Sequence, residues 1–87
     1  MFEWDDGNLD HIANHGVSPV EAEEAMLDRR RIGLPVHRSP NERRWGLIGA
    51  TDDGRVLAVI YTQRSGRLRV VTIRDANQAE RRRYRGR

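Results

Sequence analysis

The sequence contains no cysteine and no lysine. Without cysteine, a disulfide-stabilised scaffold and any metal site built from thiolates are excluded. Without lysine, all 16 basic residues are arginines, whose planar guanidinium groups bind phosphate and carboxylate in a bidentate manner. No apolar run approaches the roughly 18 residues of a membrane span, and the acidic N-terminus does not resemble a signal peptide. We therefore expect a cytoplasmic protein that has no contact with a membrane.

Aromatic residues are also few, at 6% of the 87 residues, and hydrophobic residues make up 37%. A chain of this length and composition forms one small domain with a single thin core. We therefore expect a single domain over residues 1–87. Oligomerisation or a partner would help to stabilise so small a core.

Basic residues are missing from the first part of the chain, and acidic residues are few in the last. The first 28 residues hold eight carboxylates and no basic residue. Residues 54–87 hold ten arginines against two carboxylates, Asp75 and Glu80, so the local balance is ten minus two, or +8, within an overall net charge of +3. This asymmetry favours a nucleic acid or an acidic protein as partner. The alternative is a basic face that is simply solvated.

Two helices are predicted in the first third of the chain. Asp5 or Asp6 can cap the first helix, and Gly16 is a natural C-terminal stop. The segment Ser18-Pro19-Val20-Glu21 has the pattern of a capping box with proline at the first helical position. This second helix is expected to end near Asp28 or Arg29.

The remainder of the chain has the periodicity of strands joined by tight turns. The predicted strands are residues 32–36 at an edge, 45–50, 56–62 in the centre and 68–73, with turns at 38–42, 52–54 and 64–66. Asn77-Gln78-Ala79-Glu80 is a further capping box that opens a C-terminal helix. The expected fold is therefore α+β, with two N-terminal helices, a four-stranded antiparallel β-meander and a C-terminal helix, packed as a two-layer sandwich.

Several arginines are expected to share a face of this sheet. Arg67 and Arg69 are two residues apart in one strand, so their side chains leave on the same side. The other arginines of interest in the sheet are Arg43 and Arg55, expected as neighbours across the strand pairings, Arg64 at a hairpin tip and Arg74 at a strand end. Such a group of guanidiniums would hold a phosphodiester backbone and stabilise charge that builds on phosphorus. The alternative is again that these are solvated side chains.

Histidine is the side chain best suited to proton transfer near neutral pH. His11 and His15 are four residues apart and lie on one face of the first predicted helix. The same spacing can bind zinc, but no third ligand stands out, so we expect no metal. His37 lies in a loop-like stretch and is expected to face solvent.

Tyr84 follows Arg81–Arg83 on the last predicted helix. A phenol beside several guanidinium groups can stack on a base or direct its hydroxyl at a phosphate. The alternative is that Tyr84 anchors a short polar helix to the core.

A series of short motifs runs along nearly the whole chain. They are Phe2-Glu3-Trp4-Asp5, His15-Gly16-Val17-Ser18, Glu42-Arg43 before Ile48-Gly49, Thr62-Gln63-Arg64, Arg69-Val70-Val71, and Arg74-Asp75-Ala76 before Glu80-Arg81-Arg82-Arg83-Tyr84. No single motif is specific, but their order and spacing together resemble the BrnT family of type II toxins.

The resemblance implies a ribonuclease toxin with a RelE-like fold. Such a toxin cleaves RNA without a metal or other cofactor, arrests growth, and is neutralised in a hetero-oligomer by a cognate antitoxin that often binds DNA. The motif positions that match the family imply roles for Arg64 and Arg74 in phosphate binding and transition-state stabilisation. Tyr84 matches the C-terminal tyrosine of the family.

Metal-free cleavage uses the 2′-hydroxyl of the RNA as nucleophile, so the protein must move protons and hold the phosphate. A guanidinium is a poor proton shuttle because its pKa lies above about 12, which leaves His15 first, then His11 or Tyr84. The predicted catalytic residues are Arg64, Arg74, Tyr84 and His15, and the predicted RNA-binding residues are Arg43, Arg55, Arg67, Arg69 and Arg81. A non-catalytic RNA-binding or antitoxin-binding module on the same fold is the alternative.

Overall fold

The chain folds into three helices and a four-stranded sheet, and the predicted α+β class is confirmed. The computed structural model describes residues 1–36 and 41–86. The elements are α1 (Asp6–Asn14), α2 (Pro19–Leu27), β1 (Ile32–Gly33), β2 (Arg44–Ala50), β3 (Val56–Arg64), β4 (Arg67–Asp75) and α3 (Gln78–Arg85). All neighbouring strands are antiparallel, in the order β1-β2-β3-β4. The predicted positions of β1 at an edge and of β3 in the centre are therefore confirmed.

Each helix begins at a reciprocal capping box. The side chains of Asp5, Ser18 and Asn77 accept the backbone N–H of the third helical residue, whose own side chain accepts the N–H of the cap. Each cap contributes about 1 kcal/mol to helix stability. At the other end of α1, Gly16 has φ +67°, the left-handed conformation in which glycine commonly follows the end of a helix.

The hairpin between β3 and β4 is tighter than the turn expected at residues 64–66. Ser65 and Gly66 both have positive φ, at 52° and 76°, as in the two-residue type I′ turns that match the twist of the flanking strands. Arg64 and Arg67 therefore pair within the strands. In contrast, β1 is shorter than the predicted strand at 32–36, because Pro35 has no N–H to continue the ladder. His37 and most of the predicted turn at 38–42 lie outside the described residues.

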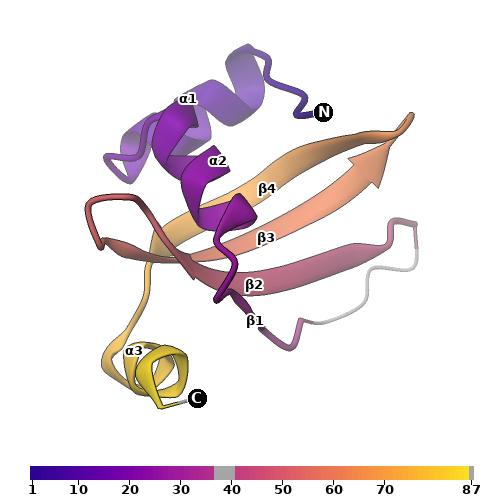
Figure 1. The fold of residues 1–87 in the computed structure, drawn as a ribbon. Helices are drawn as coiled ribbons and strands as arrows, with labels where there is room; N and C mark the ends of the chain where they lie inside the picture. Colours follow the sequence, from indigo (N-terminus) through magenta and orange to yellow (C-terminus); the bar gives the residue numbers. More distant parts are fainter. Residues whose placement is uncertain (37–40, 87) are drawn as a thin grey trace.

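The expected two-layer sandwich has its helices on one face of the sheet, but in the structure helices pack on both sides (Figure 1). Figure 1 shows α1 and α2 on one side, and α3 on the other side near one end. The main core lies under α1 and α2, and its largest fully buried members there are Ile12, Leu57, Val59, Val70 and Ile73. Gly49 permits close contact between β2 and α2, since a Cβ at this position would lie 2.0 Å from the carbonyl oxygen of Ala25.

The N-terminal segment runs along the outer edge of β4. The amide of Glu3 donates to the carbonyl of Leu68 at 2.8 Å, and the amide of Leu68 donates to the carbonyl of Met1 at 2.7 Å. This pairing covers an edge that would otherwise expose unpaired backbone groups. It also brings Glu3 and Asp5, from the acidic part of the sequence, beside the arginines of β4.

A β-bulge interrupts β4 at Val71. Tyr61 pairs with Val70 and Ile60 pairs with Thr72, so one extra residue lies between them. The bulge shifts the alternation of side chains, and Val70 and Ile73 are both buried in the core as a result.

Candidate active site

Arg55 is partly buried and is held by partners from several elements. Its guanidinium forms a bidentate pair with Asp75 at 2.7 and 3.0 Å. It also donates to the carbonyls of Gly16 and His15 at 2.8 and 3.2 Å, and lies 3.4 Å from the carboxylate of Glu21. The bond from Arg55 holds the pKa of Asp75 below its ordinary value. Arg55 thus joins the end of α1 to the sheet.

Arg69 is held in the same way by the N-terminal segment. It forms a bidentate pair with Asp5 at 2.6 and 3.2 Å, and its Nη1 lies 3.3 Å from Glu3. Only 18% of the Arg69 side chain is exposed. The hydrogen bond from Arg69 is the main reason that the pKa of Asp5 is lowered. Arg69 therefore fastens the N-terminus to β4.

Arg74 pairs with the C-terminal helix. Its two terminal nitrogens donate to the two oxygens of Glu80 at 2.7 and 2.9 Å. The Glu80 side chain is 11% exposed and also accepts the amide N–H of Asn77 in the capping box. The bond from Arg74 is the largest cause of the lowered pKa of Glu80. Arg74 thus docks the start of α3.

The register of the sheet separates arginines that the sequence suggests as one group. Arg74 pairs with Ala58, which lies six positions before Arg64 along β3, or about 20 Å away at 3.3 Å per residue. The expectation that Arg43 and Arg55 are neighbours is wrong. Because β2 and β3 are antiparallel, Arg43 lies beyond the Arg44–Thr62 pair at one end, and Arg55 lies beside the hairpin at the other.

A hollow of about 290 Å³ gathers chemically different side chains at the hairpin end of the sheet. Its lining residues are Gly7, Asn8, His11, Glu42, Arg64, Arg69, Val70 and Val71. It therefore combines an imidazole, a carboxylate and two guanidinium groups, which are the groups needed to hold a phosphate and to move protons.

Arg64 differs from the other arginine of this hollow because it is loosely held. Its guanidinium nitrogens lie 3.9 Å from the carboxylates of Glu3 and Glu42, and 57% of the side chain is exposed. These distances are longer than those of hydrogen-bonded ion pairs. The fork of Arg64 can therefore bind an incoming phosphate without breaking a strong internal pair.

His11 is positioned from α1 by a hydrogen bond to β4. Its Nε2 lies 2.9 Å from the hydroxyl oxygen of Thr72, with the donor set by the tautomer. The ring of His15 lies 5.2 Å from that of His11, measured between centroids. His15 is exposed at the end of α1 and does not line the hollow. Of the two histidines, His11 is the one that shares a site with Arg64.

Tyr84 and Arg81 attach α3 to the rest of the protein. The hydroxyl of Tyr84 donates to Asp28, whose carboxylate also accepts the amides of Ala50 at 2.8 Å and Arg30 at 3.0 Å. Arg81 donates to the carbonyl of Ala76 at 2.6 Å. Neither residue lines the hollow that contains Arg64.

The remaining predicted RNA-binding arginines flank the hairpin end of the sheet. The guanidinium of Arg43 lies over the ring of Trp45, 5.2 Å from its centroid, in cation–π geometry. Arg67 pairs with Arg64 across the hairpin and is exposed. Within the described part of the chain, no ion pair involves Arg67.

The sequence does not single out the carboxylate of the hollow, and it ranks His11 below His15. Glu42 belongs to the Glu-Arg motif before β2. No sequence periodicity links Glu42 to Arg64, because only the pairing of β2 with β3 brings the two residues together. His11 ranks second to His15 on the sequence, since both lie on the same helix and only packing against Thr72 separates them. The Glu42–Arg43 motif is the sequence feature that could have identified Glu42 as a site residue.

Among residues 1–36 and 41–86, no three His, Asp or Glu side chains come together in a way that could hold a metal ion. None of the helices in the same residues is long and apolar enough to cross a membrane.

An arginine-rich α+β domain with these groups around one hollow has the chemistry of a protein that acts on a phosphodiester backbone. Residues 4–80 match the family described as ribonuclease toxin, BrnT, of type II toxin–antitoxin systems. The match covers most of the 87 residues, and the chain belongs to this family. No curated protein matches the sequence. The protein is therefore a ribonuclease toxin, for which RNA is the substrate and a cognate antitoxin the partner.

Proposed function

We propose that the toxin is a metal-independent endoribonuclease and that the hollow between α1 and the β3–β4 hairpin is its active site. The observation that carries this proposal is the combination of His11, Glu42 and the loosely held Arg64 in one hollow. These residues supply a proton donor, a proton acceptor and a phosphate-binding group within the same small volume.

The reaction needs two proton transfers. Glu42 accepts the proton of the RNA 2′-hydroxyl while the 2′-oxygen attacks the adjacent phosphorus. The bond between phosphorus and the 5′-oxygen then breaks, and His11 in its protonated form donates a proton to that oxygen. The products are a 2′,3′-cyclic phosphate and a free 5′-hydroxyl, so atoms and charges balance without a metal or water.

Arg64 stabilises the charge that builds on the phosphorus oxygens, an effect that contributes about 3 kcal/mol at comparable sites. Arg43 and Arg67 extend the phosphate-binding surface around the hairpin. Arg74, Tyr84 and Arg81 would contact RNA well away from the reacting phosphate, and Arg55 and Arg69 act mainly by holding the scaffold. His15 is the secondary candidate for proton transfer.

Purified toxin incubated with long single-stranded RNA in EDTA tests this function. Cleavage that leaves 2′,3′-cyclic phosphate ends is expected. Arg64→Ala should slow cleavage about 100- to 1000-fold and remove growth arrest while the fold and antitoxin binding remain. Binding of RNA with steep salt dependence but no cleavage would instead favour a non-catalytic RNA-binding module, and cleavage that stops in EDTA would contradict the metal-independent mechanism.

We also infer that the antitoxin binds the outer face of α2, forming a hetero-oligomer with a DNA-binding antitoxin. Val20 and Leu27 are 64% and 55% exposed, and their spacing of seven places them in one stripe. Glu23 and Glu24 occupy the positions between them at i+3 and i+4. This apolar and acidic stripe repels RNA and suits a protein segment with apolar and basic side chains.

The double variant Val20→Asp/Leu27→Asp tests this stripe. Each lost apolar contact is worth about 1.5–3 kcal/mol when fully buried, so antitoxin affinity measured by calorimetry should fall at least about 100-fold. Ala13→Asp/Asn14→Asp adds the same charge at exposed positions of α1 and is the matched control. Unchanged affinity in the stripe variant would place the antitoxin elsewhere.

A further inference from the structure

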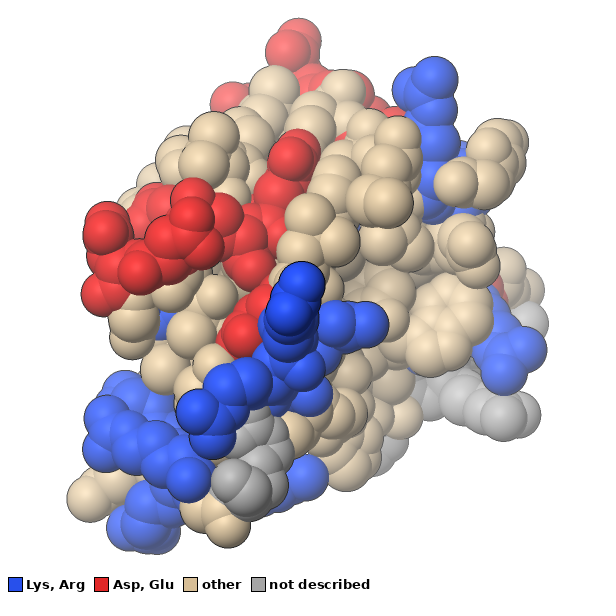
Figure 2. Space-filling model, viewed as in Figure 1, with Lys and Arg blue, Asp and Glu red and all other residues tan. Residues whose placement is uncertain are grey.

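Six arginines from two distant segments form a second basic surface, which we name the α3 patch. It consists of Arg29, Arg30 and Arg31, which follow α2, and Arg82, Arg83 and Arg85 of α3. The bond from Tyr84 to Asp28 joins the two segments, and Arg83 donates to the carbonyl of Gly33 at 3.4 Å. Figure 2 shows arginines gathered around α3, apart from the acidic side chains over α2 and the neighbouring hairpin.

The α3 patch keeps its positive charge. In the described part of the chain, the guanidiniums of Arg29, Arg82 and Arg85 have no ion pair or hydrogen bond. Arg31 and Arg83 donate only to backbone carbonyls, of Asp28 and Gly33. A backbone carbonyl leaves the formal charge of a guanidinium uncompensated. These arginines therefore differ from Arg55, Arg69 and Arg74, each of which faces a carboxylate.

Part of this charge suits the end of α3, because cations stabilise the last turn of a helix. This effect falls off within that turn, and it does not extend to Arg29 and Arg31, which belong to no helix. The helix dipole therefore accounts for some of the arginines of α3 but not for their convergence with a second basic segment.

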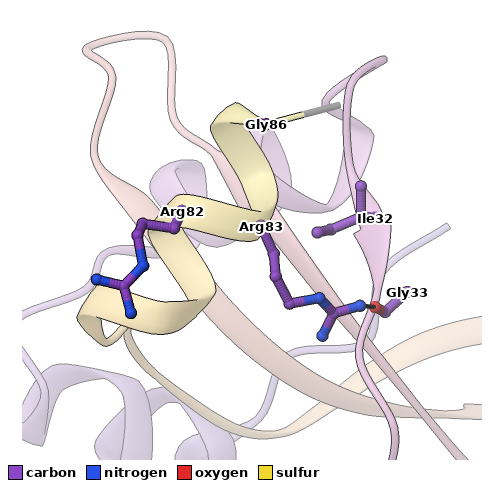
Figure 3. A pocket seen from close by; sticks show the side chains of 5 residues that line it. All are labelled: Ile32, Gly33, Arg82, Arg83 and Gly86. Atoms are coloured by element: carbon purple, nitrogen blue, oxygen red, sulfur yellow. Dashed lines mark hydrogen bonds between the residues drawn. The ribbon is translucent and has the colours of Figure 1, made fainter.

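The shape of the patch favours a polyanion backbone over a peptide. A hollow of about 540 Å³ lies beside it, lined by Ile32, Gly33, Arg82, Arg83 and Gly86 (Figure 3). Ile32 is the only apolar side chain larger than glycine in this lining, whereas a protein partner needs buried apolar anchors. Exposed guanidiniums beside an open hollow provide what a phosphodiester chain needs, namely forks for phosphates and room for a ribose or base.

The patch lies apart from the proposed active site. Arg83 contacts Gly33, which pairs with Leu47, and Leu47 pairs with Val59. Val59 is five positions before Arg64 along β3, or about 17 Å. One phosphate cannot reach both places, so the two surfaces contact different parts of an RNA strand.

We propose that the α3 patch is an RNA-anchoring site that binds the phosphodiester backbone independently of sequence and holds the substrate while another part of the strand occupies the hollow. The proposal rests on RNA being the substrate, but not on which residues cleave it.

The test measures binding of the full-length toxin to a 20-nucleotide single-stranded RNA that is 2′-O-methylated throughout. This RNA lacks the free hydroxyl needed for attack, so the result does not depend on the proposed active site. Fluorescence anisotropy over a range of salt concentrations gives Kd and its salt dependence. Arg82→Gln/Arg85→Gln should weaken binding about tenfold at physiological salt, and lower the slope of log K against log salt by about 1.4, at about 0.7 per phosphate contact.

Arg82→Lys/Arg85→Lys is the matched control, because it keeps both charges at the same positions and should keep the slope. Arg29→Gln/Arg31→Gln changes the other segment of the patch, outside any helix, and should lower the slope similarly even if changes in α3 disturb folding. Unchanged affinity and slope in both Gln variants would overturn the proposal. Loss of antitoxin affinity with unchanged RNA binding would also overturn it, and would make the patch a protein-binding surface.

Discussion

Two groups of arginines in this protein have opposite environments. Arg55, Arg69 and Arg74 each form a bidentate pair with a carboxylate, and the bonds join the sheet to α1, the N-terminus or α3. Leaving Arg30 aside, the arginines of the α3 patch form no pair with a carboxylate in the part of the chain that the structure describes. The first group uses its charge to hold the fold together, whereas the second leaves its charge available to a ligand.

The difference shows that a local charge balance is a poor measure of surface potential. Glu3, Asp5 and Glu21 come from the acidic first 28 residues, yet they lie against Arg69 and Arg55 in the folded protein. Folding thus brings parts of the two oppositely charged segments together, and these three carboxylates offset only part of the surplus of +8. Under the proposed function, the potential that attracts RNA is set by the arginines without a carboxylate partner.

The largest effect on cleavage is expected in the comparison of Arg64, which is loosely held, with its neighbour Arg69, which is paired with Asp5. Arg64→Ala should lower the rate of RNA cleavage about 100- to 1000-fold and change the free energy of unfolding by less than about 0.5 kcal/mol. Arg69→Gln should have the opposite profile, with a lower Tm and a smaller loss of rate. Single-turnover kinetics and thermal unfolding of both variants measure the two quantities. Equal losses of cleavage rate in the two variants would contradict the different roles given to Arg64 and Arg69.

The two histidines give a comparison of the same kind on α1. His11→Ala should lower the cleavage rate about 100-fold, because a general acid contributes at least that much. His15→Ala should change the rate less than about threefold, since His15 lies outside the hollow. A larger loss in the His15 variant would move the proton donor to that residue.

A smaller effect is expected at the pair that docks α3. Arg74→Gln and Glu80→Gln both break the same ion pair, and the amide introduced by Glu80→Gln retains an acceptor for the capping box. Each should cost about 1 kcal/mol of unfolding free energy, since Arg74 is half exposed. Urea denaturation measures this cost. If Arg74 serves only the fold, the two variants lose equal activity, whereas a greater loss in Arg74→Gln would show direct contact with RNA.

The smallest effect is on the pH dependence of stability. The pKa of Glu80 is lowered from its ordinary value of 4.5 by Arg74, and that of Asp75 from 3.8 by Arg55. A depressed pKa contributes stability that is fully present above the unfolded value and is lost as pH falls through the folded value. Tm should therefore decline below about pH 4 through these pairs and be insensitive to them from about pH 5 to 8. Glu80→Gln should reduce the decline, and an unchanged acid slope would contradict the coupling.

Much of the fold could be predicted because its signals are local. The capping boxes at Ser18 and Asn77, the stop at Gly16 and the turn at Asp52–Gly54 depend on residues within a few positions of each other. The candidate site was less predictable, because no local rule tells which carboxylate will meet Arg64, Arg69 or Arg74. Arg82 and Arg85 show the same limit, since only the packing of α3 beside the segment after α2 brings them close to a second group of arginines.

The sequence by itself determined the class of the fold, the order of its elements, the family and the exclusive use of arginine as the basic residue, since composition, short-range spacing and motif order express all of these. Only the tertiary structure decided which arginines remain available and that His11, Glu42 and Arg64 share a hollow. The physical reason is that ion pairing acts over a few ångströms in space. The residues that meet at these sites are separated by up to 66 positions in the chain, so only the pairing of strands and the docking of helices brings them together.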